Sequence, residues 1–479
     1  MIYISLLFYI FVVAALVFYY SFPLQKRWIV LLISNLFFYI YFYYKGWQIF
    51  LLTILFSYGA GRILPCIQKK KRKGFLLFSI IMVVIPWFAV KNGNCIWSGL
   101  LHHDPVEFIV PMGISFYTLQ VTAYLVDVFN GRIEPQKNLF RYALFISYFP
   151  QILQGPIPRY SQLQGQLMEG HTFDEKEFTK GLHLIVWGFF LKLVVADKAA
   201  VIVNQVFDHY PAYNGIYIWI ASFLYSIQLY ADFYACTTLA RGISSLFGVH
   251  LVDNFRRPYF ALSIKDFWRR WHISLSSWLR DYIYIPLGGN RKGRVSRYKN
   301  LIVTFLVSGL WHGTGVRFIA WGALHAFYQI MGEILDNPRK RIYAFLGIRN
   351  DSKLKNALER CVTFLLVNFA WIIFRADTLR KGLGMIKHMI MDFNPWILFD
   401  NRIFTLGLDW KEMLVLVAAV ILIWMVEKRQ ECGECISEEI LRQKLYVRWG
   451  IYFAAVIGIM VFGTYGFGFD AKDFIYGGF

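Results

Sequence analysis

One histidine, His312, ends an apolar segment whose composition suits acid–base chemistry. The segment runs Leu301-Ile-Val-Thr-Phe-Leu-Val-Ser-Gly-Leu-Trp-His-Gly-Thr-Gly315. An ionisable residue within or at the end of a membrane span is costly, and it is therefore a candidate for function by default. Gly309, Gly313 and Gly315 weaken the helix and permit close approach of the backbone. A broken helix at membrane depth is tolerated only where it is packed in protein or lines a cavity.

Histidine can take and return a proton near neutral pH, which makes His312 a candidate base. Backbone amide groups freed at the break would stand beside it and could stabilise an oxyanion. This combination favours acyl transfer, in which a base deprotonates an acceptor hydroxyl and the hydroxyl attacks an activated carbonyl in a water-poor tunnel. The alternative is a histidine buried for hydrogen bonding between helices, and the sequence favours neither. His325, thirteen residues further on, has a weaker claim to function.

Residues 263–290 are predicted to form one amphipathic helix in the membrane interface. Ser263 has the form of an N-terminal cap, and Asp266 places an acid in the first turn. The large apolar side chains recur every three or four residues and so share one face of a helix. They are Trp268, Trp271, Leu275, Trp278 and Tyr282. The basic side chains mostly off this face are Arg269, Arg270 and Arg280, an arrangement typical of interfacial helices.

His272 follows a tryptophan of this apolar face by one residue. Two interpretations stay open for it. It is either a polar residue near the headgroups that hydrogen-bonds a backbone carbonyl, or a pocket residue that faces a reaction tunnel. Spacing along the chain does not choose between them.

The composition indicates the environment in which these residues act. Of 479 residues, 57% are hydrophobic, 19% are aromatic and only 17% are charged. A soluble globular protein has about 25% charged and about 45–50% apolar residues, so the apolar excess must face lipid. No polar linker divides the chain. We therefore predict an all-α, multi-pass integral membrane protein with a single domain over residues 1–479.

About 11–13 transmembrane helices are expected, because a span needs about 20 mostly apolar residues. The candidate segments are residues 1–22, 28–44, 47–64, 74–90, 107–127, 139–154, 181–196, 215–236, 301–312, 316–335, 358–374, 410–427 and 447–466.

The net charge of +20 indicates topology, because 50 Lys and Arg residues stand in short clusters between apolar segments. A nucleic-acid partner is not expected. The run Lys69–Lys73 is assigned to the cytoplasmic side, and the loop around Lys45 to the other side. The segment from Arg256 to Lys299 contains eleven basic residues and only two acidic ones, which also indicates a cytoplasmic position. The same charge could contact anionic headgroups or a negatively charged cytosolic cofactor.

Several kinds of site lack their usual signals. The only close cysteine pair is Cys432-Gly-Glu-Cys435, and residues 427–444 add no histidine or further cysteine, so no metal site is predicted. No phosphate-binding loop, Gly-x-Ser-x-Gly elbow or His-Glu-x-x-His helix occurs. ATP-driven transport and a serine-hydrolase mechanism therefore lose their support. A transporter or export channel without chemistry remains an alternative.

The chain resembles the membrane-bound O-acyltransferase family, most closely the branch typified by the membrane subunit of alginate O-acetylation. The resemblance extends from about residue 107 to the C-terminus, and residues 1–106 add N-terminal helices. The matching strings are Pro111–Gln120, Phe149–Pro156, Asn254–Phe260, Phe267–Tyr282, Ile285–Lys292 and Ser308–Gly313. The resemblance is specific because the long tryptophan block and the Trp-His-Gly string occur together.

The resemblance implies helices around a central tunnel, with His312 as the essential catalytic residue and His272 as a second tunnel histidine. Asp232, Trp311, Gly313 and His325 are expected to support the tunnel. Alginate-type members usually read Asp-Phe-Ser-Gly-Tyr-Ser/Thr-Asp, whereas this chain reads Asp232-Phe-Tyr-Ala-Cys-Thr-Thr238, so the second acid is missing. Alginate itself is therefore not assigned as the acceptor.

The expected reaction moves an acyl group, acetyl first of all, from a cytosolic thioester such as acetyl-CoA to a hydroxyl of an exported polysaccharide. No bound cofactor is expected, and Arg269, Arg270 and Arg280 are candidates for the donor side. An extracytoplasmic transferase is the expected partner, and the bacterial cytoplasmic membrane the expected location. D-alanyl transfer to teichoic acid from a carrier protein is the alternative within the family.

Overall fold

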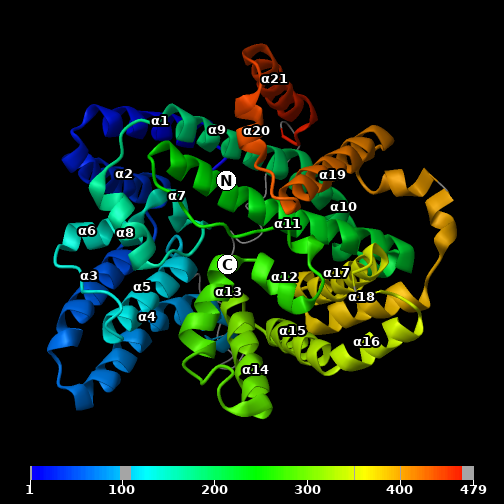
Figure 1. Cartoon of the computed structure of the whole chain (residues 1–479), viewed down its shortest axis with the longest axis horizontal. Helices are drawn as coiled ribbons and strands as arrows, with labels where there is room; N and C mark the ends of the chain where they lie inside the picture. Colours follow the sequence, from blue (N-terminus) through cyan, green and yellow to red (C-terminus); the bar gives the residue numbers. More distant parts are fainter. Residues whose placement is uncertain (1–2, 98–108, 350, 400, 466–479) are drawn as a thin grey trace. The chain divides into compact units, whose positions relative to one another are not determined.

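The computed structural model describes residues 3–97, 109–349, 351–399 and 401–465 (Figure 1). Helices account for 79% of the structure, and no β-strand occurs in the described residues, which confirms the all-α prediction. Residues 1–2, 107–108 and 466 of the predicted spans lie outside this part.

Contacts within the chain define two compact units. The first comprises Met1–Ile185, Cys236–Asp253 and Tyr476–Phe479, and the second comprises Val186–Ala235 and Asn254–Ile475. Helix α11 (Gly215–Leu246) begins in the second unit and ends in the first. The expectation of a single domain over residues 1–479 stays a prediction.

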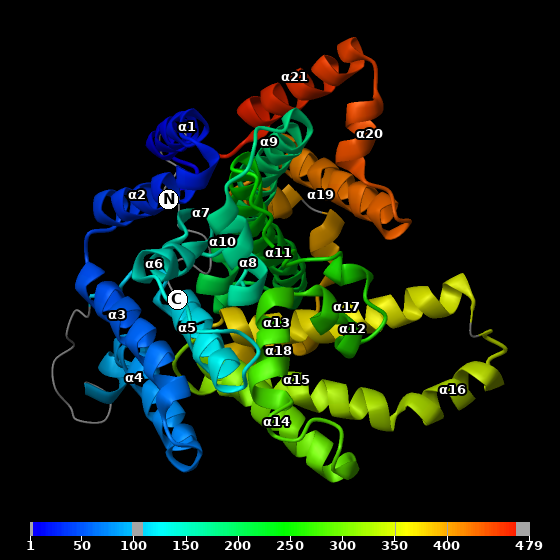
Figure 2. The same cartoon turned by 60° about the vertical axis from the view of Figure 1, so that its left-hand side comes forward.

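The first unit is built from helices that pack against their neighbours in the sequence. Helix α4 packs against α3 and α5, and α2 packs against α1 and α6 (Figure 2). The helices are α1 (Leu6–Ser21), α2 (Arg27–Phe42), α3 (Trp47–Ile63), α4 (Lys69–Trp97), α5 (Ile114–Phe129), α6 (Leu139–Ser147), α7 (Phe149–Ile152), α8 (Tyr160–Glu169), most of α9 (Glu175–Phe189) and the last part of α11, with the 3-10 turns η1 (Leu24–Lys26) and η2 (Leu64–Cys66).

The second unit carries the segments that the sequence singled out for chemistry. Its π-helical segments are η3 (Phe190–Ala196) and η6 (Arg280–Tyr284), and its 3-10 turns are η4 (Tyr210–Ala212), η5 (Pro258–Phe260), η7 (Pro395–Phe399) and η8 (Asn401–Thr405). Its α-helices are α10 (Asp197–Asp208), α12 (Ile264–Arg270), α13 (Ile273–Leu279), α14 (Gly293–His312), α15 (Val316–Ile334), α16 (Asp336–Phe345), α17 (Lys353–Arg375), α18 (Leu379–Met391), α19 (Trp410–Glu431), α20 (Ile436–Arg442) and α21 (Leu445–Phe462), in addition to the first part of α11.

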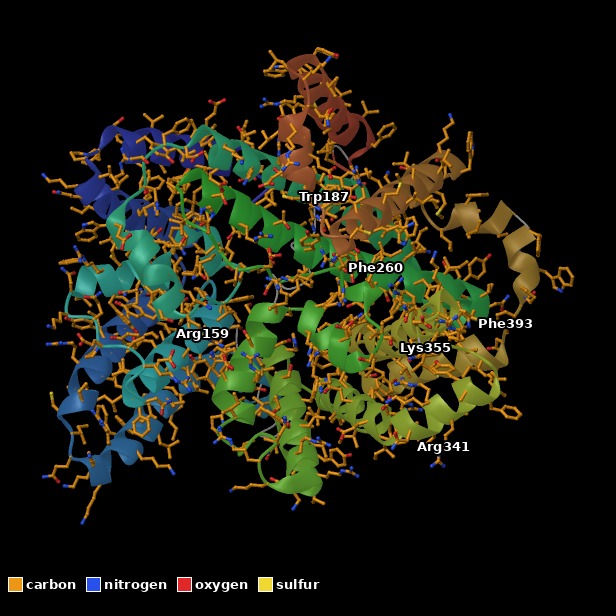
Figure 3. The ribbon with its side chains drawn as sticks, viewed as in Figure 1. Arg159, Trp187, Phe260, Arg341, Lys355 and Phe393 are labelled. Carbon is orange, nitrogen blue, oxygen red and sulfur yellow. The ribbon has the colours of Figure 1, made fainter. Side chains whose placement is uncertain are left out.

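Within the described part of the chain, four helical segments are long and apolar enough to cross a membrane by themselves. They are Trp47–Cys66, Lys69–Gly93, Lys353–Arg375 and Leu445–Phe462. Large apolar side chains are also exposed on the helices, as at Met391 at the end of α18, and in the connections between them, as at Phe393, which is 55% exposed (Figure 3). Such a surface needs lipid around it. The protein is therefore membrane-integral, while the full count of 11–13 spans stays a prediction.

One predicted span is interrupted in the structure. The segment 139–154 divides into α6 and α7 at Tyr148, whose ψ of 105° is not helical. Pro150 lies in the first turn of α7. Proline fits the first turn of a helix but not its interior, because it lacks an N–H and clashes with the preceding turn. The apolar composition of this segment therefore does not correspond to one continuous helix.

Two glycines let α14 and α15 pack closely. A Cβ on Gly309 would lie 2.2 Å from the carbonyl oxygen of Phe318, and one on Gly322 would lie 2.3 Å from that of Phe305. No side chain fits at either position. Small residues of this kind are common where membrane helices approach each other, and here they fix the end of α14 against α15.

Candidate active site

His312 is the last residue of α14, as the glycine-rich sequence after it predicted. The backbone leaves the helix at Gly313, which is extended, and a Cβ there would lie 2.2 Å from the ring of Phe318. The carboxyl end of a helix presents carbonyl groups, so the amide groups expected beside His312 cannot come from α14. Helix α15 begins four residues later, at Val316, and the N–H groups of its first turn are the available ones.

Aromatic rings enclose the imidazole of His312. The centroid of its ring lies 4.9 Å from that of Trp311, 5.1 Å from that of Trp321 and 5.5 Å from that of Phe374. Only 3% of the residue is exposed. These walls exclude bulk water, which strengthens every electrostatic interaction inside the site.

His272 lies at a break in the segment that the sequence predicted as one helix, and that prediction is wrong. Ser263 does cap α12, because its hydroxyl accepts a hydrogen bond from the Asp266 N–H, as predicted. The helix ends at Arg270, and α13 begins at Ile273. Between them His272 adopts the left-handed conformation, with φ 45° and ψ 53°. The aromatic residues of 263–290 therefore do not lie along one helix.

The loop that begins at Asn254 holds this break in place. The backbone carbonyl of Asn254 accepts a hydrogen bond from the Ile273 N–H at 2.9 Å. Its side-chain oxygen accepts one from the Ser274 N–H at 3.1 Å, which caps the start of α13. The Arg256 N–H donates to the Arg270 carbonyl at 2.9 Å. Asn254 thus contacts the residues on the C-terminal side of His272 directly, which the motif Asn254–Phe260 alone did not indicate.

The break brings His272 next to His312. The two ring centroids lie 6.5 Å apart, and the ring of His272 also contacts Phe233 at 4.7 Å and Trp311 at 6.0 Å. Neither ring nitrogen of His272 has a hydrogen-bond partner among the described residues. Burial lowers the pKa of His272 to about 3, so the ring is neutral at physiological pH. One small polar group held between the two rings could reach both of them.

His325 has a different environment. Its Nδ1 accepts a hydrogen bond from the Trp268 indole N–H at 3.2 Å. Trp321 contacts both histidines, at 4.9 Å from His325 and 5.1 Å from His312. His325 is thus held within a cluster of aromatic rings around Trp321, which suits support of the site better than proton transfer.

Asp232 belongs to a buried cluster of charges. Lys192 Nζ lies 2.7 Å from Asp232 Oδ1 and 2.9 Å from Asp197 Oδ1, and all three side chains are buried. Lys192 comes from the π-helical segment η3, and such segments often occur at functional sites. Lys192 and Asp197 were not singled out in the sequence, although a lysine inside an apolar segment is a usable signal. Asp232 also precedes Phe233, whose ring contacts His272.

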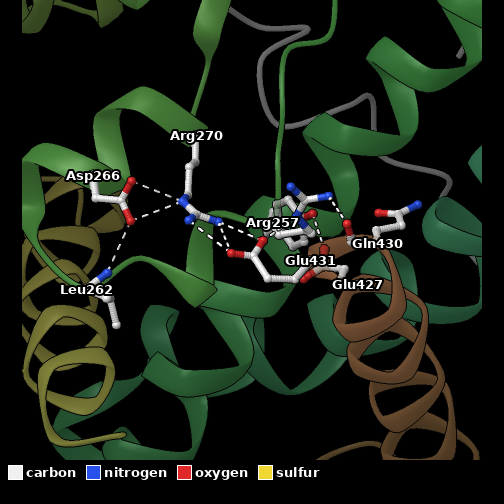
Figure 4. Close-up of polar contacts among 8 residues, drawn as sticks. Arg257, Leu262, Asp266, Arg270, Glu427, Gln430 and Glu431 are labelled. Carbon is white, nitrogen blue, oxygen red and sulfur yellow. Dashed lines mark hydrogen bonds and ion pairs between the residues drawn. The ribbon is translucent and has the colours of Figure 1, made fainter. Parts of the chain in front are cut away.

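Arg270 is engaged by two carboxylates (Figure 4). Its guanidinium lies 3.1 Å from Asp266 and 3.0 Å from Glu431, the last residue of α19. Arg257 pairs with the same Glu431 at 2.6 Å and donates to the Gln430 carbonyl. Burial raises the pKa of Glu431, but hydrogen bonds from Arg270 outweigh burial and place its pKa below the usual range. Arg270 therefore ties α12 to the end of α19.

The other two arginines proposed for the donor side lie on the surface. Arg269 is exposed, and Arg280 pairs with Asp281 at 2.8 Å with 62% of its side chain exposed. Their role in donor binding stays a prediction. Among the described residues, no group of three or more His, Cys, Asp or Glu side chains is placed to hold a metal ion.

The fold and the site together define a helical membrane protein with a pair of buried histidines at a helix end. Comparison with known proteins then identifies its family. The model of MBOAT, the membrane-bound O-acyltransferase family, matches residues 133–373. The chain belongs to this family.

Curated relatives are named for the acylation of alginate, peptidoglycan and teichoic acid. A probable alginate O-acetylase of Pseudomonas fluorescens is 35% identical over 325 residues, which are 67% of this chain and 63% of the relative. A peptidoglycan O-acetyltransferase of Helicobacter pylori is 36% identical over 329 residues, 63% of this chain and 60% of the relative. A teichoic acid D-alanyltransferase of Bacillus subtilis is 28% identical over 319 residues, 64% of this chain and 79% of the relative. The chain spans less than two thirds of the first two relatives.

Proposed function

We propose that this protein is a membrane O-acyltransferase that moves an acyl group from a cytosolic thioester to a hydroxyl of an exported polysaccharide or of a partner transferase. The observation that carries the proposal is the pair of buried histidines, His272 and His312, with ring centroids 6.5 Å apart among aromatic side chains. A pair of this kind can hold a hydroxyl and take its proton while bulk water, which would hydrolyse the donor, is kept out.

In the proposed reaction His312 is the base. It removes the proton from the acceptor hydroxyl, and the oxygen attacks the thioester carbonyl to form the new C–O bond. As the C–S bond breaks, the thiolate leaves and takes the proton back from the His312 imidazolium, so the histidine ends the cycle unchanged. The N–H groups at the start of α15 are the candidates to stabilise the oxyanion of the tetrahedral intermediate.

His272 has a complementary role in this proposal. A histidine whose pKa is about 3 is neutral throughout the physiological range and is only a weak base there. Its neutral ring can still donate one hydrogen bond and accept another. We assign it the task of orienting the hydroxyl toward His312.

Acetyl is the acyl group best supported, because two of the relatives are named for O-acetylation. Acetyl-CoA is then the simplest thioester donor. The likeness to a teichoic acid D-alanyltransferase supports D-alanyl transfer from a carrier protein as a second candidate. An extracytoplasmic transferase as partner and the cytoplasmic membrane of a bacterium as location complete the proposal.

Replacement of His312 tests the proposed reaction. His312→Gln keeps a polar side chain but removes the base, and the loss of a general base costs about 10²–10⁴ in rate. We expect transfer of radiolabel from acetyl-CoA by the purified protein to fall by at least this factor, with an unchanged melting temperature in detergent. The exposed His209→Ala serves as the matched control and should retain full activity.

The same preparation separates the alternatives. Full transfer by His312→Gln would contradict the proposed role of His312. Passage of a glycan across vesicles that survives this substitution, with no thioester consumed, would instead support an export channel. If the wild-type protein neither transfers nor hydrolyses acetyl-CoA but accepts a D-alanyl group from a carrier protein, the second candidate replaces the first.

A further inference from the structure

A cavity of about 320 Å³ lies in the first unit, far along the chain from both histidines. Its lining residues come from the turn η2 after α3, from the start of α4 and from the loop after α5. Figure 2 shows α3, α4 and α5 side by side. The residues that line it include Pro65, Arg72, Arg132, Glu134 and Pro135.

Two arginines in this cavity are fixed by contacts with the chain. The Arg72 Nε donates to the Leu64 carbonyl at 2.9 Å, and the Arg132 Nη1 lies 3.1 Å from the buried Asp127 carboxylate. A guanidinium has five N–H donors in a planar fork, so each arginine is oriented by one contact and has further donors for a ligand. Half of the Arg132 side chain, 51%, is exposed. Two oriented guanidinium groups in one cavity suit a phosphate group.

The sequence next to the cavity is strongly basic. Helix α4 begins with the five consecutive basic residues Lys69-Lys-Lys-Arg-Lys73, whereas Glu134 is the acidic residue in the cavity lining. This basic run is also the strongest indication that the α3–α4 connection faces the cytoplasm. The cytoplasmic leaflet is the one that attracts basic segments through its anionic lipids.

The position of the cavity at the ends of two membrane spans favours a lipid over a soluble anion as its ligand. Trp47–Cys66 and Lys69–Gly93 are two candidate membrane spans, and the cavity lies at the end of the first and the start of the second. It is therefore at the level of the phospholipid headgroups. Apolar side chains are exposed on the same two helices beyond it, at Ile63, Leu77 and Phe78, where acyl chains could pack.

We propose that this cavity binds the phosphodiester headgroup of an anionic phospholipid of the cytoplasmic leaflet, with Arg72 and Arg132 as its phosphate ligands. The site is distinct from the histidine pair, and the proposal does not depend on the acyl-transfer reaction. Each basic residue near an anionic surface contributes about a fivefold gain in binding.

Native mass spectrometry of the purified full chain tests the proposal. Phosphatidylglycerol is titrated into protein in detergent, with phosphatidylcholine as the zwitterionic comparison. We expect wild type to retain phosphatidylglycerol selectively, and the double variant Arg72→Gln/Arg132→Gln to bind it roughly 25-fold more weakly. The control Arg349→Gln removes an exposed arginine outside the cavity and should bind as wild type does.

Two further measurements keep the proposal open to refutation. Glu134→Gln removes the carboxylate of the cavity without removing either arginine, and it should strengthen binding of phosphatidylglycerol about fivefold. Glycerol 3-phosphate, the soluble headgroup, should compete only weakly. Equal binding by the double variant and wild type, equal retention of phosphatidylcholine, or full competition by glycerol 3-phosphate would each overturn the lipid assignment.

Discussion

At the scale of single residues, the site depends on one unusual backbone conformation. His272 has φ 45°, a region that costs an L-residue other than glycine roughly 1–2 kcal/mol. Strain of this kind persists only where surrounding contacts enforce it, and it is concentrated at functional sites. The conformation turns the chain between α12 and α13 and places the imidazole against Phe233 and His312.

Substitutions of His272 by alanine and glycine test this conformation directly. Both remove the ring, but only glycine adopts the left-handed region without cost, so His272→Gly should be more stable than His272→Ala by about 1 kcal/mol. In a continuous helix the order reverses, because alanine is favoured there by about 1 kcal/mol. The unfolding midpoints of the two variants in the same detergent provide the measurement, and an alanine variant more stable than the glycine variant would contradict the break at His272.

At the scale of elements, short helices are held by contacts from distant parts of the chain. Helices α12 and α13 have seven residues each, too few to be stable alone. The loop at Asn254 fixes their junction, and Glu431 at the end of α19 binds Arg270 at the end of α12. Helix α14, which carries His312, is fixed separately by the close approach to α15 at Gly309 and Gly322. The two histidines are thus positioned by different elements.

Asn254 is predicted to act through the position of His272. Asn254→Ala leaves the buried Ser274 N–H without its acceptor, which should cost about 1–2 kcal/mol of stability. Asn254→Asp keeps an acceptor oxygen at the start of α13, where a negative charge is favourable, and should restore much of the loss. If the residue positions His272, the alanine variant should lose kcat for acyl transfer more than it changes KM for the thioester, and the aspartate variant should recover it. An alanine variant with unchanged kcat would restrict Asn254 to a role in stability.

At the scale of the whole molecule, the charge distribution predicts the orientation in the membrane. The basic block Arg256–Lys299 is assigned to the cytoplasm, and Arg257 and Arg270 of this block bind Glu431. The exposed Cys432, which follows Glu431, is therefore predicted to lie on the same side of the membrane.

Labelling of single cysteines tests this orientation. In a variant whose only cysteine is Cys432, a membrane-impermeant maleimide should react in inside-out vesicles and not in intact cells. In the matched control, Tyr44→Cys is the single cysteine. Tyr44 is 65% exposed and lies in the loop that joins α2 to α3, which is assigned to the other side of the membrane. This variant should show the reverse pattern. Labelling of both cysteines from the same side would refute the topology.

Local patterns along the sequence were sufficient to predict the membrane environment of this protein and the ends of two of its helices. The apolar excess indicated helices in lipid, the glycines after His312 indicated a helix end at that histidine, and Ser263 indicated the start of α12. Each of these features depends on residues within a few positions of one another, so composition and spacing suffice to reveal them.

Only the tertiary structure decided where the long-range contacts fall. The tryptophan spacing of 263–290 favoured one helix, but the helix breaks at His272, where the Ile273 and Ser274 N–H groups donate hydrogen bonds to Asn254, 20 residues before Ser274. The ion pair of Lys192 with Asp232 joins residues 40 positions apart, and the spacing of charges along the chain does not reveal it. Helical periodicity is a weak local preference, and buried hydrogen bonds and ion pairs between distant segments outweigh it.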